Sequence, residues 1–112
     1  MVTINTEFSL NNAVTVNGIA GLIKRIHNGP WMSQPRQNRF YVFYDTPVHG
    51  EIGDWFHVSL LIPVGASSAG TFDAVFDIGQ TVIAQSPSDT LINTTCTGLH
   101  YGPMITATIE VM

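Results

Sequence analysis

The sequence is rich in β-branched side chains. Valine, isoleucine and threonine account for 33 of the 112 residues, whereas alanine, leucine, glutamate and lysine account for only 17. A branched Cβ loses rotamer freedom in a helix but packs well on a pleated strand. The excess therefore predicts an all-β fold. A chain of this length has room for one hydrophobic core, so we expect a single domain over residues 1–112.

Two segments, 71–78 and 105–111, alternate between apolar and polar residues. A period of two is typical of a strand that buries one face and exposes the other. The residues expected on the buried faces are Phe72, Phe76, Ile105 and Ile109. The carboxylates expected on the exposed faces are Asp73, Asp77 and Glu110.

Two central runs, 40–44 and 55–62, carry bulky side chains on both faces. Strands of this kind are usually covered on both sides. The second cover would be another sheet, a neighbouring subunit or a ligand, and the sequence leaves these three alternatives open.

Turn signals rich in glycine, proline and asparagine divide the chain into eight or nine short strands. The pair Asn17-Gly18, which follows Val14 and Val16, predicts a tight hairpin turn. Together these patterns predict a β-sandwich, jelly-roll-like in preference to immunoglobulin-like. One alternative is a short helix over residues 19–26, where apolar residues have helical spacing but glycines disfavour a helix.

Charged residues are sparse. They make up 11% of the chain, against about 25% in an average soluble domain, and the formal net charge is −4. Four lysine and arginine residues cannot supply the basic face that nucleic acid or an anionic membrane requires, so we expect neither partner. Sparse surface charge promotes association. We therefore expect a symmetric homo-oligomer, with a trimer preferred over a dimer.

Targeting signals are missing from the sequence. We expect no signal peptide, because the first residues lack a basic and a continuous apolar region, and no membrane span, because no apolar run approaches the roughly 20 residues that cross a bilayer. We expect the protein in the cytoplasm or within an assembled particle. The single cysteine, Cys96, cannot form an internal disulfide.

The densest group of aromatic and polar side chains lies in two segments, 27–39 and 45–55. Both are predicted to be loops at one end of the sandwich, where loops often carry recognition. Indole rings stack on apolar faces of a ligand, and amides and charged groups supply hydrogen bonds. We expect one surface for a neutral polar ligand, although Trp31 could instead plug the core. The candidate ligand-binding residues are Trp31, Gln34, Arg36, Asn38, Arg39, Asp45, His49, Glu51, Asp54 and Trp55.

Motifs for catalysis and metal binding are missing. His49 and His57 lie eight residues apart, which is not the spacing of a zinc site. The sequence Gly-x-Ser-x-Gly does not occur. Asp73 and Asp77 would lie about 13 Å apart along a strand, too far for glycoside hydrolysis. We expect no metal ion, no cofactor and no catalytic residue.

Three function classes follow from these patterns. The leading one is a non-enzymatic recognition module, lectin-like or host-receptor-binding, that takes a neutral polar ligand such as a glycan. The second is a structural assembly protein, such as a viral capsid, phage appendage or filament subunit. The third is a small enzyme or ligand-binding barrel. In composition and strand pattern the chain resembles tumour-necrosis-factor-like lectins, phage receptor-binding heads and small viral coat proteins, a resemblance that implies an oligomeric β domain and assigns no residue a role.

Overall fold

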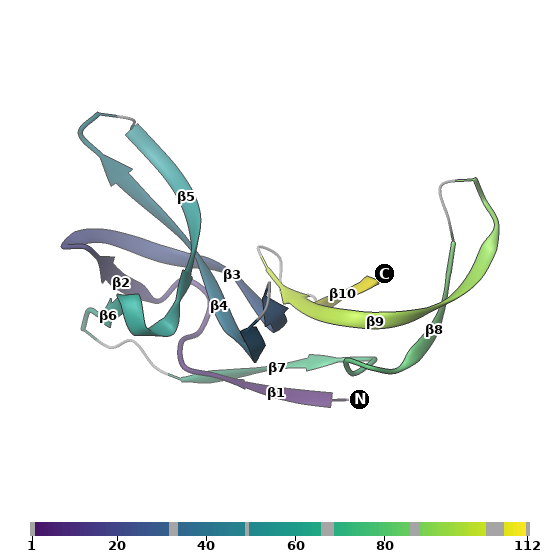
Figure 1. The fold of residues 1–112 in the computed structure, drawn as a ribbon. Helices are drawn as coiled ribbons and strands as arrows, with labels where there is room; N and C mark the ends of the chain where they lie inside the picture. The colour runs from purple at the N-terminus through teal and green to yellow at the C-terminus, as the bar shows by residue number, and fades with distance from the viewer. Residues whose placement is uncertain are drawn as a thin grey trace.

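The computed structural model describes residues 2–31, 34–48, 50–65, 69–85, 88–102 and 107–111. Within these ranges the chain forms ten strands and one short 3₁₀ helix, η1 (Val58–Leu60), and the prediction of an all-β fold is confirmed (Figure 1). The strands are β1 (Val2–Thr6), β2 (Ala13–Val16), β3 (Ile19–Trp31), β4 (Gln34–Thr46), β5 (Gly50–His57), β6 (Leu61–Pro63), β7 (Gly70–Ala74), β8 (Thr81–Gln85), β9 (Leu91–Tyr101) and β10 (Ala107–Val111).

Two antiparallel sheets form a sandwich-like single domain. The main sheet has the order β10-β9-β3-β2-β6, with β4 and β5 added beside β3 and with β8 beside β9. The second sheet is the two-stranded ribbon of β1 and β7. The described residues therefore form ten strands rather than the eight or nine that we expected, and the jelly-roll connection stays a prediction.

The hydrophobic core lies between the β1–β7 ribbon and one face of the main sheet. Phe72 of the ribbon stacks on Tyr101 with ring centroids 4.9 Å apart, and Phe8 meets the edge of Phe40 at 5.4 Å. The buried apolar residues of this core are Ile4, Phe8, Val14, Val16, Ile23, Ile26, Phe40, Val42, Leu61, Phe72, Ala74, Cys96 and Leu99.

The hairpin between β2 and β3 confirms the predicted tight turn. Asn17 and Gly18 have positive φ angles of 50° and 78°, as a type I′ turn requires. The segment after the turn is strand β3, so the alternative of a helix is wrong. The helical spacing of the apolar residues in this segment comes from a β-bulge, a shift of the register with β4 between Ile23 and Arg25. This bulge lets Ile23 and Ile26, three residues apart, both face the core.

The run 55–62 is not one strand. Strand β5 ends at His57, whose Nδ1 accepts a hydrogen bond from the Ser59 backbone N–H at 3.1 Å and so caps η1. Strand β6 then begins in a different orientation, with Leu61 buried and Ile62 exposed. The alternation in this run therefore reflected two short strands joined by a turn.

The alternation in segment 71–78 extends only as far as β7. Phe72 is buried and Asp73 is exposed, as predicted, but the strand ends at Ala74 and Phe76 is 38% exposed. The prediction that Phe76 is buried is therefore wrong, because the chain bends before its side chain reaches the core. Asp77, predicted to be exposed, is half-buried beside Arg36.

The second alternating segment is described only from residue 107. Glu110 is exposed as predicted, and Ile109 is only partly buried against the core. Ile105 lies outside the described residues.

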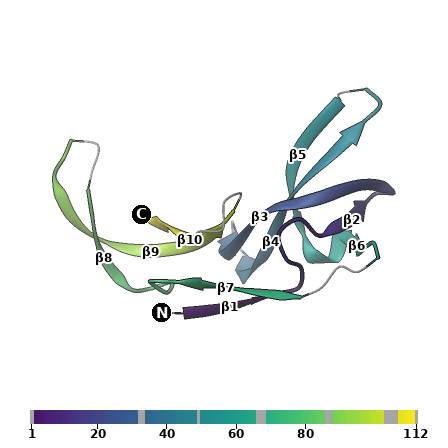
Figure 2. The ribbon, with the colours of Figure 1, turned by 180° about the vertical axis from the view of Figure 1, so that it is seen from behind.

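The molecule is elongated, with extents of 46 × 29 × 28 Å and a radius of gyration of 15.5 Å, against about 13 Å for a compact chain of this length. Two hairpins cause the elongation. The β4–β5 hairpin and the β8–β9 hairpin both project on the side of the main sheet away from the β1–β7 ribbon (Figures 1 and 2).

Candidate functional site

The face of the main sheet that points away from the β1–β7 ribbon, here called the outer face, carries a cluster of aromatic, imidazole and guanidinium groups. The strand register places its members together: His27 lies opposite His100, Arg25 opposite Tyr41, and Tyr41 opposite Trp55. Directly paired residues of antiparallel strands point to the same side of a sheet. We call Arg25, His27, Tyr41, Trp55 and His100 the aromatic–histidine cluster.

Trp55 stands at the centre of this cluster. The centroid of its ring system lies 5.2 Å from that of Tyr41, 5.6 Å from that of His100 and 6.2 Å from that of His27, and all three contacts are edge-to-face. Edge-to-face geometry places the positive edge of one ring on the negative face of another. The indole is half-buried as a result.

Glycines make room for the two rings that flank Trp55. A Cβ on Gly98 would lie 3.0 Å from the Nε2 atom of His27, and a Cβ on Gly29 would lie 3.2 Å from its Cε1 atom. A Cβ on Gly53 would lie 2.5 Å from the ring of Tyr41. The ring of His27 therefore packs against the backbone of β9 at Gly98, and the ring of Tyr41 packs against the backbone of β5 at Gly53. A larger side chain at either glycine would displace the ring.

Charge in the cluster is mixed. The Arg25 guanidinium lies 5.2 Å from the centre of the Tyr41 ring, a cation–π arrangement, and Nε2 of His27 lies 3.2 Å from the Glu110 carboxylate. Burial lowers the pKa of His100 from its ordinary value, and the nearby charges of Arg25 and His27 lower it further against the opposing effect of Glu110. At neutral pH the cluster thus offers a neutral imidazole beside a cation and several rings.

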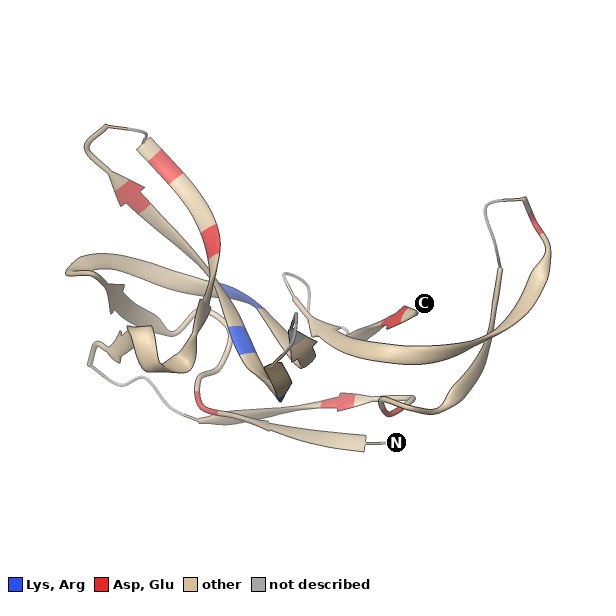
Figure 3. Cartoon of the chain, in the orientation of Figure 1, with Lys and Arg blue, Asp and Glu red and all other residues tan. Residues whose placement is uncertain are grey.

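Only part of the predicted site lies on the outer face. Trp55 and Arg39 do, and Arg39 Nη2 donates a 2.6 Å hydrogen bond to Oε1 of Gln34. Asp45 and Glu51 face each other across the β4–β5 hairpin on the same side as Tyr41 and Trp55, and both are exposed near its tip. In Figure 3 this hairpin carries a group of acidic residues.

Arg36 and Asn38 lie on the opposite side of β4 from Arg39. They alternate with Gln37 and Arg39 on β4 and point toward the β1–β7 ribbon. Asn38 Nδ2 donates to the backbone oxygen of Asn5 at 2.9 Å and to Glu7 Oε1 at 2.7 Å. Arg36 donates to Asn28 Oδ1 at 2.7 Å and to Asp77 Oδ1 at 2.9 Å. The bonds to Asn5, Glu7 and Asp77 connect the main sheet to the β1–β7 side of the molecule, whereas the bond to Asn28 lies within the main sheet.

The hydrogen bonds of Asp77 also explain its acidity. The backbone N–H of Ile78, followed by Arg36, lowers the pKa of the Asp77 carboxyl. Asp54 makes a similar local bond, accepting from the backbone N–H of Trp55 at 2.8 Å, and lies opposite Val42 on the other side of β5 from the indole.

The two predicted loops are hairpins, and they do not meet. Segment 27–39 contains the end of β3 and the start of β4. Strand β3 tolerates Pro30 because this residue falls in a register shift between Gly29 and Trp31, where the ladder of hydrogen bonds is already interrupted. The two hairpins lie at opposite ends of β4, whose 13 residues span about 40 Å at a rise of roughly 3.3 Å per residue. His49 and the side chain of Trp31 lie outside the described residues.

The sequence analysis placed Glu110 on an exposed face but did not include it among the candidate site residues, and it likewise left out Arg25, His27, Tyr41 and His100. Arg25, Tyr41 and His100 each neighbour a buried residue on their own strand, which is a signal for exposure to one side, and Glu110 follows the partly buried Ile109. Their convergence depends on which strands pair, and Tyr41 and His100 are 59 positions apart in the sequence. No local pattern carries that information.

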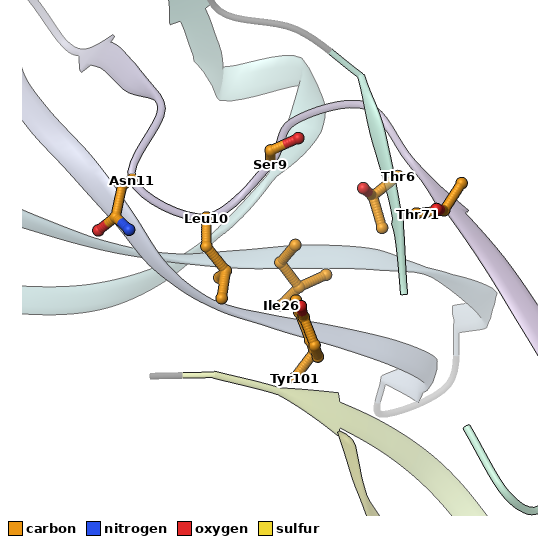
Figure 4. Close-up of a pocket in the computed structure, with 7 residues that line it drawn as sticks. All are labelled: Thr6, Ser9, Leu10, Asn11, Ile26, Thr71 and Tyr101. Carbon is orange, nitrogen blue, oxygen red and sulfur yellow. The ribbon is translucent and has the colours of Figure 1, made fainter. Parts of the chain in front are cut away.

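A cavity of about 290 Å³ opens on the other side of the main sheet (Figure 4). It lies between the segment after β1, strand β7 and the ring of Tyr101, and its lining mixes hydroxyl, amide and apolar groups. The lining residues are Thr6, Ser9, Leu10, Asn11, Ile26, Thr71 and Tyr101. Pockets that bind small molecules have volumes of roughly 300–1,000 Å³, so this cavity lies at the lower limit of that range.

The β8–β9 hairpin is a second notable surface. Among the described strands, β8 pairs with β9 alone. Ile83 and Leu91 are each 71% exposed, and Ile92 is also exposed. The hairpin from Thr81 to Thr95 has one charged residue, Asp89, near its tip (Figure 3). We call this projecting hairpin the arm.

Within the described ranges, no group of three or more histidine, cysteine or acidic side chains is arranged to hold a metal ion. No helix in the described part of the chain is long and apolar enough to cross a membrane. No protein-family model, curated protein or solved structure matches the chain.

Proposed function

We propose that the chain is a non-enzymatic structural subunit that assembles with copies of itself. The observation that carries this proposal is the arm, a projecting two-stranded hairpin in which two large apolar side chains, Ile83 and Leu91, are each 71% exposed. A two-stranded hairpin is at best marginally stable when water surrounds both faces. One face of the arm is covered within the chain, since Val82 is 6% exposed, and packing against another subunit would cover the opposite face, which carries Ile83 and Leu91.

The total surface supports the same proposal. The chain exposes 6865 Å², whereas a compact protein of 12.2 kDa exposes about 6,100 Å². Much of that surface is apolar or neutral, because only 11% of the residues are charged. Interfaces between identical subunits are more apolar than ordinary surface, so this composition suits burial between copies.

The mass in solution tests the proposal. Sedimentation or light scattering at several micromolar concentrations is expected to give a multiple of the chain mass. A mass that stays constant with concentration indicates a closed oligomer, and one that grows without limit indicates a filament. The mass of a single chain throughout the range would overturn the proposal.

A second candidate function is recognition of a neutral polar ligand, such as a glycan, on the outer face. The observation that favours it is the aromatic–histidine cluster, where Trp55 lies among groups that stack and donate hydrogen bonds. A glycan array with the wild-type protein tests it, with Trp55→Phe as a variant that keeps a ring and Trp55→Ala as one that removes it. Binding lost in Trp55→Ala, with the fold intact, is the expected result, and equal binding by all three proteins would exclude the outer face.

A further inference from the structure

The geometry points to the free edge of β8 as the contact between subunits. We propose that β8 pairs antiparallel with β8 of a second copy, so that two arms join into a four-stranded sheet with the order β9-β8-β8-β9. This inference rests on the proposed assembly and specifies where it occurs. Strand addition of this kind forms main-chain hydrogen bonds along an edge, and alternating side chains set the specificity.

The chemistry of β8 suits an edge that pairs. Its sequence, Thr-Val-Ile-Ala-Gln, contains no charge, proline or glycine. Natural proteins normally protect sheet edges with charged residues, proline or a bulge, because an open edge is a template for another strand. Strand β8 has the open, neutral and β-branched composition that such protection avoids.

Other edges in the described part of the chain carry protection. Strand β5 carries Glu51 and Asp54, β6 ends in Pro63, β7 carries Asp73 and β10 carries Glu110. On β1 the backbone oxygen of Asn5 already accepts a hydrogen bond from Asn38. Among these edges, that of β8 in the arm is the one where no charge or proline would hinder an added strand.

The arm has a second edge, along the first half of β9, and it is the weaker candidate. Strand β10 lies beside β9 as far as Cys96, so the space for an added strand ends there. Asn93, a poor strand former, occupies the middle of that edge. The edge of β8 extends over all five of its residues.

A second copy is the natural occupant because β8 is complementary to itself. Antiparallel pairing of identical strands is two-fold symmetric, and such an interface places the same surface on both partners. When the axis passes beside Ile83, this residue faces Ile83 of the partner subunit. Val82 then faces the partner's Ala84, and Thr81 faces the partner's Gln85. Apolar residues meet apolar ones, a hydroxyl meets an amide, and no like charges meet.

The extended shape leaves surface for such a contact: the 6865 Å² of the chain exceeds the surface of a compact chain by roughly 800 Å², an excess shared by the β4–β5 hairpin and the arm. A two-fold contact implies an even number of chains, so this proposal replaces the sequence-based preference for a trimer with a dimer or a dimer of larger units.

Charge at the edge gives the first test. Ile83→Lys places a charge opposite its own symmetry mate, and the sedimentation mass is expected to halve. Val48→Lys is the matched control, because Val48 is 83% exposed at the distant β4–β5 turn and its replacement should leave the mass unchanged. Circular dichroism confirms that each variant keeps the all-β fold.

Crosslinking gives a second test that needs no loss of assembly. Ile83→Cys is expected to form a disulfide-linked dimer under mild oxidation, because the two Cα atoms would lie about 5 Å apart. Asn93→Cys is the matched control: it lies opposite Ile83 on the same face but on the other strand, about 14 Å from its mate across three strand spacings. The native Cys96 is 1% exposed and should not react.

The outcomes separate the two proposals. If the wild-type protein is a single chain, both the assembly and the edge contact are wrong. If it is an oligomer but Ile83→Lys keeps its mass and Ile83→Cys does not crosslink, assembly stands and the β8 edge is excluded. A trimer, or crosslinking by Asn93→Cys in place of Ile83→Cys, would also overturn β8 pairing. Should Ile83→Lys fail to fold, the crosslinking result decides.

Discussion

The Nε2 atom of His27 lies 3.2 Å from Oε2 of Glu110, a contact that joins β3 to β10 across the intervening strand β9. It passes over Gly98, where a Cβ would lie 2.7 Å from the glutamate oxygen and 3.0 Å from the histidine nitrogen. A side-chain bond can cross a strand in this way only where that strand has no side chain. The contact depends on three residues from three strands.

Gly98→Ala should therefore destabilise the protein. The added methyl group would displace both partners, and overpacking of this kind costs about 1–3 kcal/mol. Urea denaturation measures the change in the free energy of unfolding. The same substitution in a Glu110→Ala background should cost less, because one of the two obstructing groups is gone, and equal costs in both backgrounds would contradict the steric explanation.

Acid should weaken the fold through His100. Burial and the charges of Arg25 and His27 lower the pKa of this imidazole in the folded state, so the unfolded chain takes up the proton first as the pH falls below about 6.5. The contribution to stability is thus present above the ordinary pKa and is lost on acidification. The melting temperature should fall between pH 7.5 and 5.5, and His100→Gln should reduce that fall. An unchanged pH dependence in the variant would assign the effect to other groups.

Asn38→Ala should weaken the contact between the two sheets and so lower the free energy of unfolding. The amide donates to Asn5 and Glu7 and accepts a 2.7 Å hydrogen bond from the buried Asn28, so truncation leaves polar groups without their partner. Loss of a buried partner costs about 1–3 kcal/mol. Gln34→Ala, at an exposed position, is the control and should change stability by less than about 0.5 kcal/mol. Comparable losses in chemical denaturation would contradict this assignment.

Trp55→Ala should destabilise the fold moderately and Trp55→Phe much less. The indole makes edge-to-face contacts with Tyr41, His27 and His100, each worth about 0.5–1.5 kcal/mol beyond the area that it buries. We expect a loss of about 2–3 kcal/mol for alanine, measured by thermal or chemical unfolding. A change near zero would show that the ring belongs to the surface alone.

Several features of the protein follow from the sequence by itself. The β-branched excess determines the fold class, because the preference acts residue by residue. The Asn17-Gly18 turn follows from the positive φ angles that these residues tolerate, and the burial of Phe72 beside the exposed Asp73 follows from two-residue periodicity. Each of these is a local property, decided within a few residues of chain.

Tertiary structure decided what local patterns do not contain. The bulge between Ile23 and Arg25 allows Ile23 and Ile26 to be buried in one core although they are three residues apart. A spacing that is typical of a helix therefore occurs in a strand. Pairing of β3 with β4 and β9 brought His27, Tyr41 and His100 to one face and sent Arg36 to the other side. Strand partners are selected by which apolar faces can be buried together over the whole chain. The composition of the outer face and the isolation of the arm are consequences of that global choice.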